Sequence, residues 1–384
     1  MLGHNDRMRM KAITKLEIIP DSLRRPAGDR HSISPARLLR FRIADLKSFM
    51  AKRSRSGWIT SELRSMNLSI ALCTYNGAVY LKEQLESITA QTRPPDELII
   101  SDDQSTDDTL RLMEAFAASA GFPVRLSVNE SNLGTAKNFE KAISLCRGDV
   151  IVLSDQDNVW HSDYLESIER IFEAKPELSL VLSDAELVDE TLRLDDETLF
   201  ERLRFNDRKQ RLFKSGRALD VQLRENLVLG ATAAFRANLK ELVLPISGDG
   251  PLIHDGWIVL LIAAVGEIDI INRPLVKYRQ HSAQQCGVGR TNTWHEIRTS
   301  SKIDRACYVR QANQINEALA RLSSYGLSSR NETLLREKIL HLHERARLPV
   351  PKSQRWRSVG KEVVNRRYHR FSKGWVSVAQ DLLA

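Results

Sequence analysis

The stretch IVLSDQDNVW, residues 151–160, runs from an apolar segment directly into two aspartates one residue apart. The apolar part predicts a buried strand, and Asp155 and Asp157 follow at its end. Asp residues at such places ordinarily form Asx turns or cap helices, but capping cannot use both carboxylates of a pair. Because adjacent anions repel, a cation or hydrogen-bond donors should compensate them. The stretch therefore predicts a strand that carries an acidic site at its carboxyl end.

Short apolar segments alternate with helical patterns around this stretch. Strands are predicted at residues 68–73, 97–101, 124–128, 149–154 and 179–184, and helices at residues 80–91, 107–118, 135–146 and 162–174. A polar, Arg-rich insertion at about 190–216 is followed by a small-residue strand at 230–235, a helix at 255–265, and strands near 267–271 and 275–279. This alternation is typical of βαβ units. We predict an α/β fold with a Rossmann-like, mostly parallel central sheet flanked by helices.

The composition is that of an ordinary globular protein, with 384 residues of which 42% are hydrophobic. The longest apolar run, residues 257–265, is far shorter than the roughly 20 residues of a membrane-spanning helix. The first 20 residues lack the apolar core of a secretory signal. Four widely spaced cysteines form no CxxC pair, so we interpret them as free thiols. We expect a cytoplasmic protein.

The net charge of +8 is concentrated at the two ends of the chain. Residues 1–65 hold 15 Lys and Arg against 6 Asp and Glu, and residues 351–384 hold 8 against 2, which leaves the body acidic. An acidic body argues against a nucleic-acid groove, and the basic ends favour contact with an anionic surface, first of all phospholipid headgroups at the inner face of the cell membrane. Residues 36–50 predict an amphipathic helix.

Charge and secondary-structure pattern divide the sequence into three parts. We predict a basic, partly disordered N-terminal extension over residues 1–66, an α/β domain over 67–288, and a helical, basic C-terminal region over 289–384. The C-terminal tail interleaves Trp356, Tyr368, Phe371 and Trp375 with Arg and Lys, which suits either an interfacial segment or a helix packed on the domain.

Polar side chains follow three of the predicted strands, where open α/β sheets bind their ligands. The first strand leads into the turn Thr74-Tyr75-Asn76-Gly77, and the second into Asp102 and Asp103. Carboxylates suit Mg²⁺ or Mn²⁺, and Mg²⁺ is commonly held by one or two of them plus substrate phosphates. The carboxylate of Asp103 could accept the N3–H of uracil or thymine. Together with Asp155 and Asp157, these turns predict a pocket for a pyrimidine nucleotide diphosphate with a metal.

Several motifs, in this order, resemble family 2 glycosyltransferases. They are ALCTYNGAVYLKEQLESITAQTRPPDELIISDDQSTDDT, NLGTAKNFEKAI, LSDQDNVW, SDAELVDE, HDGWIVLLIAAVG and YRQH. The resemblance covers about residues 68–281 and is nearest to the rhamnosyltransferase-like branch of bacterial surface-polysaccharide and lipopolysaccharide assembly. It implies a GT-A fold for residues 67–288, with a nucleotide-binding half and an acceptor-binding half around one sheet.

The resemblance also implies roles for individual residues. Asp155 and Asp157 match the DxD pair, with Asp157 as the more direct metal ligand. Asp255, in the run His254-Asp255-Gly256-Trp257, matches the catalytic base of inverting members. His281 matches a histidine near the metal and diphosphate. Close relatives often carry Asp where this chain has Asn158, a change that leaves the pair intact.

Other positions are candidates for the nucleotide-sugar site. Asp103 matches the carboxylate that contacts the base, with Thr74 and Tyr75 near the nucleoside. The further candidates for contact with the nucleotide sugar are Asp102, Lys137 and Asp155. Packing or solvation is the alternative for Lys137, a helix cap for Asp255, and a strand-end histidine for His281.

These observations predict an inverting, metal-dependent glycosyltransferase. It would move a sugar, with rhamnose as the first candidate, from a dTDP- or UDP-sugar to a glycan or lipid-linked acceptor. Asp255 would take the proton of the acceptor hydroxyl, and Mn²⁺ or Mg²⁺ would stabilise the departing diphosphate. A sugar nucleotidyltransferase would need a Gly-rich, basic loop that TYNGAVYL lacks. An inactive membrane or nucleic-acid adaptor is the other alternative, and the presence of Asp155, Asp157 and Asp255 disfavours it.

Overall fold

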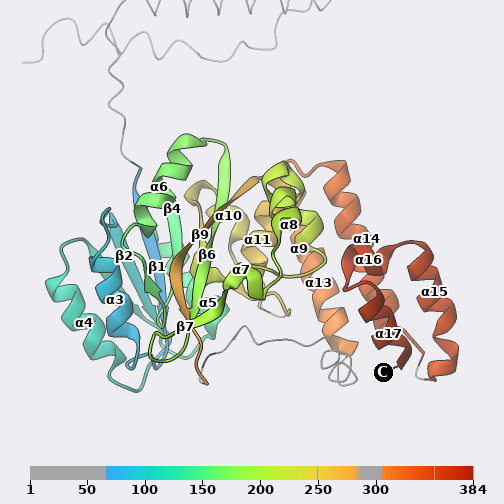
Figure 1. Ribbon diagram of the computed structural model, residues 1–384, viewed down its shortest axis with the longest axis horizontal. Helices are drawn as coiled ribbons and strands as arrows, with labels where there is room; N and C mark the ends of the chain where they lie inside the picture. The colour runs from blue at the N-terminus through green and yellow to red at the C-terminus, as the bar shows by residue number, and fades with distance from the viewer. Residues whose placement is uncertain (1–65, 249, 283, 285–304, 350, 384) are drawn as a thin grey trace, which may run out of the picture. The chain divides into compact units, whose positions relative to one another are not determined.

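The computed structural model describes residues 66–383 except 249, 283, 285–304 and 350 (Figure 1). Residues 65–384 belong to one compact unit of the chain. The helix predicted at 36–50 lies outside the described residues, as does nearly all of the predicted N-terminal extension.

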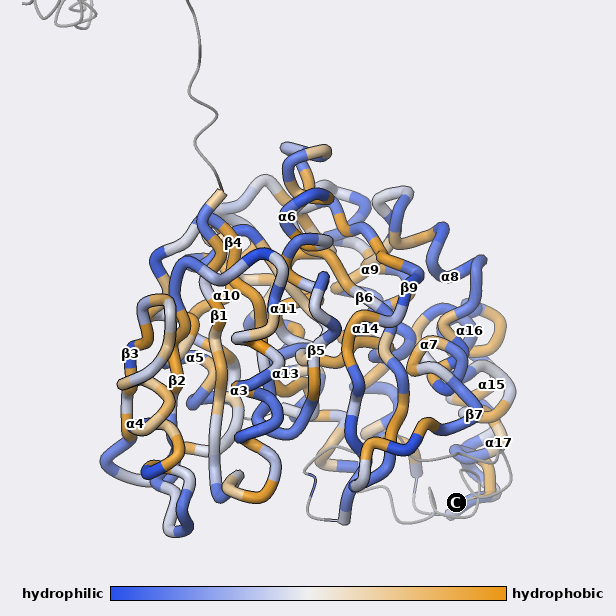
Figure 2. Tube along the Cα trace, turned by 60° about the vertical axis from the view of Figure 1, so that its left-hand side comes forward, coloured by the Kyte–Doolittle hydropathy of each residue, from blue (hydrophilic) through white to orange (hydrophobic). Residues whose placement is uncertain are grey.

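The first half of the sheet is parallel, and it is buried except for the edge strand β3. Its strands lie in the order β3-β2-β1-β4, with bounds β1 Leu68–Thr74, β2 Glu97–Asp102, β3 Val124–Val128 and β4 Val150–Asp155. Every residue of β1 is buried, as expected for a central strand covered on both faces. Figure 2 shows the hydrophobic stretches of β1, β2 and β4 lying together. The connecting helices are α3 Leu81–Thr89, α4 Thr109–Ser119 and α5 Thr135–Leu145.

The second half of the sheet mixes strand directions. β8 (Ala233–Arg236) lies antiparallel between β4 and β6 (Leu178–Val188), and β9 (Glu267–Arg279) continues parallel to β6. The short strands β5 (Val159–Trp160) and β7 (Leu194–Thr198) pair antiparallel with β9 and β6. Six of the nine strands in the described residues therefore run in one direction, which confirms the predicted mostly parallel α/β sheet.

Two predicted elements differ in detail from the structure. The strand predicted at 230–235 begins only at Ala233, because Gly230–Thr232 forms a 3-10 turn. The two strands predicted near 267–271 and 275–279 form the single strand β9, whose pairing with β6 shifts register near Ser183 and Asp184. A polar interruption at residues 272–274 therefore marks an irregularity within one strand rather than a turn between two.

Further helices surround the sheet and fill the insertion. They are α6 Tyr164–Ala174, α7 Leu199–Arg202, α8 Asp207–Leu212, α9 Ala218–Gln222, α10 Lys240–Val243 and α11 His254–Val265. Helix α11 is apolar on all sides because it packs against α5, α9, α10 and α13 at once. This packing fixes the first turn of α11, which begins at His254.

The carboxyl-terminal part of the described chain is helical. It comprises α13 Arg305–Leu322, α14 Ser329–Ala346, α15 Trp356–Val364, α16 Arg367–Phe371 and α17 Trp375–Leu383. Helix α13 joins this part to the sheet domain by packing on α11, where the Gln314 side chain donates to the Leu252 carbonyl over 2.7 Å. Among the described residues, no helix has both the length and the apolar character needed to cross a membrane.

Candidate functional site

A cavity of about 520 Å³ opens where the carboxyl ends of β1, β2 and β4 meet the start of α11 and the end of β9. Most of the residues singled out from the sequence line it together. These are Thr74, Tyr75, Asp103, Asp155, Asp157, Asp255 and His281. The fold thus collects polar groups from segments that are far apart in the chain.

The turn after β1 is held by a side chain from the acidic turn after β4. Gln156 accepts a hydrogen bond from Tyr75 N over 2.8 Å and donates one to Tyr75 O over 3.0 Å. Gly77 makes room for this contact, because a Cβ at Gly77 would lie 2.1 Å from Gln156 Oε1. The two turns are therefore fixed to each other, and Tyr75, which is half exposed, stands at the cavity.

Asp102 and Asp103 have different surroundings although they are adjacent. The Asp102 carboxylate is fully buried and accepts from Thr74 Oγ1, Ser105 N and Ser105 Oγ over 2.6–2.8 Å. The Asp102 carboxylate does not line the cavity. It lies beneath the site, where it holds the turns after β1 and β2 together. Asp103 lines the cavity and accepts from Leu133 N and Gly134 N, both over 2.8 Å.

Oδ1 of Asp103 accepts a hydrogen bond from Asn129 Nδ2 in addition to the one from Leu133 N. Oδ2 accepts only from Gly134 among the described residues. Since a carboxylate oxygen has two lone pairs, Oδ2 keeps one direction for a further donor. The loop before α5 is thereby fixed on Asp103 without using up its carboxylate.

The acidic pair after β4 has the chemistry of a hard-cation site. Oδ1 of Asp157 is buried and has no hydrogen-bond partner, while Oδ2 lies 3.0 Å from Nε2 of His281. An unpaired buried carboxylate oxygen is costly unless a cation or donor meets it. Burial, and then the charges of Asp157 and Asp255, raise the pKa of Asp155. These carboxylates therefore favour a positive charge in the cavity.

No group of three or more His, Cys, Asp or Glu is arranged to hold a metal ion by itself in the part of the chain that the structure describes. Asp155, Asp157 and His281 line one cavity without forming a closed ligand set. This arrangement fits a metal that takes its remaining ligands from substrate phosphates, as Mg²⁺ commonly does.

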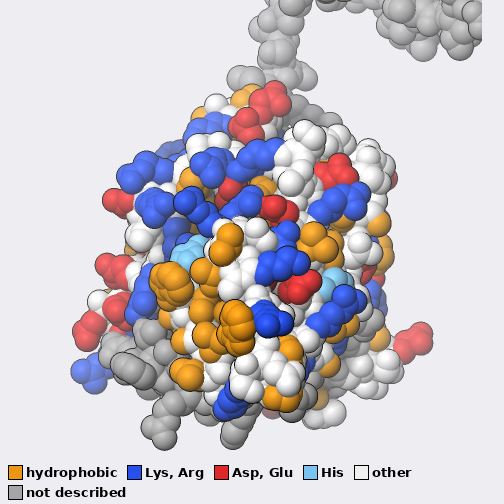
Figure 3. Space-filling view, turned by 90° about the vertical axis from the view of Figure 1, so that its right-hand side faces the viewer, with side chains coloured by type: hydrophobic (Ala, Val, Ile, Leu, Met, Phe, Trp, Pro, Cys, Tyr) orange, Lys and Arg blue, Asp and Glu red, His pale blue; other side chains and the backbone are white. Residues whose placement is uncertain are grey.

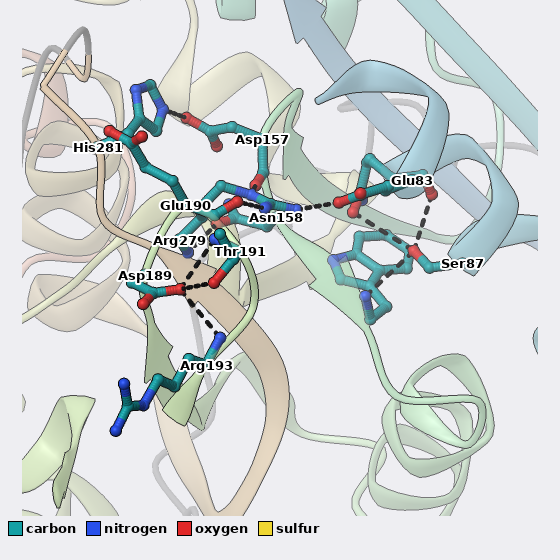
Figure 4. A network of polar contacts seen from close by, with 12 residues as sticks. Glu83, Ser87, Asp157, Asn158, Asp189, Glu190, Thr191, Arg193, Arg279 and His281 are labelled. Carbon is teal, nitrogen blue, oxygen red and sulfur yellow. Dashed lines mark hydrogen bonds and ion pairs between the residues drawn. The ribbon is translucent and has the colours of Figure 1, made fainter. Parts of the chain in front are cut away.

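A buried arginine supports the acidic turn from behind (Figure 4). The guanidinium of Arg279 donates from Nε to Asp157 O over 2.9 Å and from one terminal nitrogen to Glu190 O over 2.6 Å. It also forms an ion pair with Glu83 and lies 4.5 Å from the centre of the Tyr80 ring. We did not identify Arg279 as a site residue from the sequence, although it lies in the motif YRQH.

Asn158, where the resemblance noted in the sequence would lead us to expect Asp, contacts Arg279 and does not line the cavity. Its Oδ1 accepts from Arg279 N over 3.2 Å, and only 1% of the residue is exposed. The turn Asp189–Arg193 beside it is closed by its own hydrogen bonds, with Asp189 Oδ1 accepting from Thr191 N and Arg193 N (Figure 4). The departure from the family pattern thus falls on a side chain that braces the strand β9.

Asp255 lies in the first turn of α11 and is buried, with 4% exposure. The N-cap position of α11 belongs to Ile253, whose side chain makes no capping hydrogen bond. Its oxygens accept from Gly256 N over 2.5 Å and from Gly230 N over 3.2 Å. The bond from Gly256 N lies within the first turn of α11, as a helix-capping contact does, whereas the bond from Gly230 N ties Asp255 to another segment.

His254 is a neighbour of Asp255 in the wall of the cavity. Its ring stacks on Phe139 with centroids 3.9 Å apart, and neither ring nitrogen has a hydrogen-bond partner. Burial lowers the pKa of His254, so the ring is neutral near pH 7. Gly230 touches it closely, since a Cβ there would lie 2.5 Å from Nε2.

Besides Asp102, the candidate Lys137 lies away from the cavity. Lys137 donates to Glu140 Oε2 over 2.8 Å and to Ile246 O over 3.0 Å, and does not line the cavity. Asp184 also lies outside it, and its Oδ1 accepts from Ala185 N and Phe200 N. For Lys137 the packing alternative describes the observed contacts, and Asp184 anchors the insertion to β6.

The fold is that of a GT-A type domain, and comparison with solved structures agrees. S. aureus TarS 1–349, solved in complex with UDP-GlcNAc, superposes with a TM-score of 0.53 over 83% of this chain and 88% of TarS, at 16% identity. At that identity the likeness concerns the fold alone. Residues 69–239 match Glycosyl transferase family 2, and the chain carries a domain of this family.

Curated relatives match parts of the chain. An uncharacterized glycosyltransferase of Nostoc is 25% identical over 57% of this chain and 66% of its own length. The dTDP-rhamnosyl transferase RfbG of Shigella flexneri is 39% identical over 25% of this chain and 35% of its own. The abequosyltransferase RfbV of Salmonella typhimurium is 31% identical over 30% and 35%. The chain thus spans about a third to two thirds of the length of these relatives.

Proposed function

We propose that the chain is an inverting, metal-dependent glycosyltransferase that moves a sugar from a dTDP- or UDP-sugar to a glycan or lipid-linked acceptor. The observation that carries this proposal is the single cavity that joins Asp103, Asp157 and Asp255. Three carboxylates from distant segments converge there, one with a free lone-pair direction and one with an unpaired buried oxygen. Such convergence favours a polar, multiply charged ligand.

The nucleotide would bind at the ends of β1 and β2. Oδ2 of Asp103 accepts the N3–H of the pyrimidine ring in this proposal, and the half-exposed Tyr75 covers the nucleoside. Adenine and cytosine lack a donor at that ring position, so Asp103 would select uracil or thymine. The contacts from Leu133 and Gly134 hold the carboxylate in one orientation for this recognition.

The diphosphate would lie against the turn after β4. Asp155 and Asp157, with His281 beside them, would hold Mn²⁺ or Mg²⁺ there together with phosphate oxygens. When bound, the cation supplies positive charge that stabilises the negative charge growing on the leaving diphosphate. Arg279 and Gln156 keep the turn in position through their contacts with Asp157 O and the Tyr75 main chain.

Asp255 would act as the general base on the acceptor. Its carboxylate takes the proton of the acceptor hydroxyl while that oxygen bonds to the anomeric carbon. The bond from this carbon to the diphosphate oxygen breaks, and its electron pair leaves with the diphosphate. A single displacement of this kind inverts the anomeric configuration. Gly230 N and Gly256 N hold the carboxylate of Asp255 in place for this step.

Rhamnose is the donor sugar that we propose first. Support comes from two relatives whose names state the transfer of a deoxysugar. They are the dTDP-rhamnosyl transferase RfbG, 39% identical over 101 residues, and the abequosyltransferase RfbV. We propose a glycan or lipid-linked acceptor of bacterial surface-polysaccharide biosynthesis, and transfer at the cytoplasmic surface of the membrane. The basic ends of the chain support this last point.

Thermal unfolding of the full chain with nucleotides tests the donor site. UDP or dTDP with Mn²⁺ should raise the melting temperature, and EDTA should remove the increase. ADP with Mn²⁺ should raise the melting temperature much less. Asp157→Ala should lose the metal-dependent part of the increase, whereas Asp108→Ala, which removes an exposed carboxylate just before α4, should not. Equal stabilisation of Asp157→Ala with and without metal would contradict the metal assignment.

A panel of nucleotide sugars tests the reaction itself. Each donor is offered with a bacterial glycolipid extract, and products are detected by mass spectrometry. We expect a mass increase of one deoxyhexose with dTDP-rhamnose. Transfer from another nucleotide sugar alone would replace the donor that we propose, and no transfer from any dTDP- or UDP-sugar would contradict the enzyme assignment.

A further inference from the structure

The last helix of the described chain exposes its apolar side. In α17 the polar residues Ser377, Gln380 and Asp381 are buried together with Val378. Trp375 and Leu383 are each 66% exposed, and Ala379 and Leu382 lie partly exposed between them. These four follow the spacing of one helical stripe. A helix in an isolated globular protein normally shows the opposite orientation, so this stripe has the character of a contact surface.

Helix α15 presents a second apolar stripe next to basic residues. Trp356 is 62% exposed and Val364 is 82% exposed, and they lie about two turns apart along the helix and about 80° apart around it. Arg357 and Lys361 are exposed on the neighbouring stripe, and the guanidinium of Arg357 lies 5.2 Å from the Trp356 ring centre. The buried side of α15 carries Val359 and Glu362 instead.

The two helices present these stripes from one packed unit. Helices α15 and α17 contact each other, with Arg355 donating to Asp381 O over 3.0 Å and Lys352 to Leu383 O over 2.6 Å. Figure 3 shows hydrophobic side chains gathered on this end of the protein with Lys and Arg around them. We give the name tail face to seven of the exposed residues of α15–α17, namely Trp356, Arg357, Lys361, Val364, Arg366, Trp375 and Leu383.

The tail face is basic because its acidic residues are turned inward. The segment 351–384 has two acids, Glu362 and Asp381, and both are buried. Glu362 pairs with His341 and Arg367 over 2.7 and 2.9 Å, while Asp381 pairs with Arg345. Six of the basic residues of the same segment are exposed. Both acids of the segment are thus buried, and the exposed charged side chains that the segment itself contributes are basic.

Two aromatic residues that the sequence suggested for an interface lie in the core instead. Tyr368 and Phe371 are 0% and 2% exposed, and the Tyr368 hydroxyl donates to Asp381 over 2.6 Å. The interfacial interpretation of the tail is therefore wrong for these two residues. The interfacial interpretation stays a prediction for Trp356 and Trp375, which are exposed.

We propose that the tail face docks onto an anionic phospholipid bilayer. Exposed Trp rings, aliphatic side chains and Lys or Arg around them match the interface between headgroups and acyl chains. Residues 1–65 of this chain carry an excess of positive charge, so they would be repelled from the tail face. A nucleic acid would satisfy the positive charges but would leave Val364 and the apolar stripe of α17 without a partner.

Sedimentation of the full chain with lipid vesicles tests this proposal, and it does not depend on the proposed transfer reaction. The protein should bind vesicles of phosphatidylcholine with about 30% phosphatidylglycerol and not vesicles of phosphatidylcholine alone. Lys361→Glu with Arg366→Glu should weaken binding about 20-fold or more, because each lost cation costs roughly fivefold. Trp356→Ser with Trp375→Ser should weaken binding at low and high salt alike.

Matched controls separate the tail face from general charge and from the basic N-terminal segment. Lys82→Glu with Arg111→Glu makes the same change of net charge at exposed positions on α3 and α4, and should bind vesicles far more tightly than the tail-face charge variant. Leu194→Ser removes an exposed apolar side chain on β7 and should bind like the wild type.

Wild-type binding by both tail-face double variants would overturn the proposal. So would a shift of the Trp double variant from dimer to monomer with unchanged vesicle binding, since the tail face would then join two copies of the chain. Loss of sugar transfer with intact vesicle binding would contradict only the proposed reaction.

Discussion

The Nε–H of Arg279 donates a hydrogen bond to the main-chain carbonyl of Asp157 over 2.9 Å. This contact ties the end of β9 to the acidic turn after β4, across 122 positions of sequence. Arg279 is 1% exposed, and its side chain also reaches Glu190 O and Glu83. One guanidinium therefore fixes three segments around the carboxylate pair.

Arg279→Lys should lower kcat/KM about 100-fold while the protein remains folded. An ammonium keeps the positive charge beside Glu83 but lacks the fork that reaches both carbonyls at once, so the turn at Asp157 shifts. Steady-state kinetics and circular dichroism check this outcome. Arg273→Lys changes an exposed arginine on the same strand that pairs with Asp163, and it should behave like the wild type. Equal losses in both variants would contradict a special role for Arg279.

Gly230→Ala should disturb the base without touching the donor site. The new Cβ would lie 2.5 Å from His254 Nε2 and 3.5 Å from Asp255 Cβ, so the first turn of α11 must move. We expect a loss of about 1–3 kcal/mol in unfolding free energy and a fall in kcat of at least about tenfold. Denaturant unfolding and kinetics measure both, and UDP affinity should stay within about twofold of the wild type.

Gly121→Ala is the matched control for this substitution, because a Cβ at Gly121 meets nothing within 4 Å. Its unfolding free energy and kcat should equal those of the wild type. If Gly230→Ala left kcat unchanged, transfer would not depend on the exact position of Asp255. That result would weaken the assignment of Asp255 as the base.

Lys338 should make stability depend on pH above neutrality. Burial, helped by the charge of Arg345, lowers the pKa of Lys338 to about 7, below that of an unfolded lysine. Between pH 7 and 10 the unfolded chain therefore binds a proton that the folded chain has lost, and the unfolding free energy rises with pH. Relative to Lys338→Met, the wild type should gain up to about 1.4 kcal/mol per pH unit in this window.

Urea unfolding at pH 7.5 and at pH 9 measures this difference. Lys82→Met, which removes an exposed lysine, should follow the wild-type pH dependence. Parallel pH curves for the wild type and Lys338→Met would contradict the lowered pKa of Lys338.

Much of the fold and part of the site could be predicted from the sequence because both depend on local pattern. Apolar segments alternating with helical patterns predicted β1, β2, β3 and β4, and their carboxyl ends had to meet at one edge of the sheet. Asp103 follows β2 and Asp155 ends β4, so their presence in one cavity follows from topology. Their roles in donor binding stay predictions.

The remaining features depend on contacts that no local pattern encodes. Asp102 and Asp103 are adjacent, yet only the direction in which each side chain leaves the turn decides which one lines the cavity. The span of Arg279 across three segments exists only after β9 has paired with β6. Likewise, Tyr368 and Trp375 are both aromatic residues among basic ones, and the packing of α15–α17 decides which is buried.

The sharpest single measurement is sugar transfer by Asp255→Asn, made alongside its affinity for UDP and Mn²⁺. Asparagine retains the size of the side chain and an oxygen for Gly230 N, but it cannot take the proton of the acceptor hydroxyl. The account predicts that transfer falls at least about 100-fold while nucleotide affinity stays within about twofold. Full transfer activity in Asp255→Asn would contradict the assignment of Asp255 as the base.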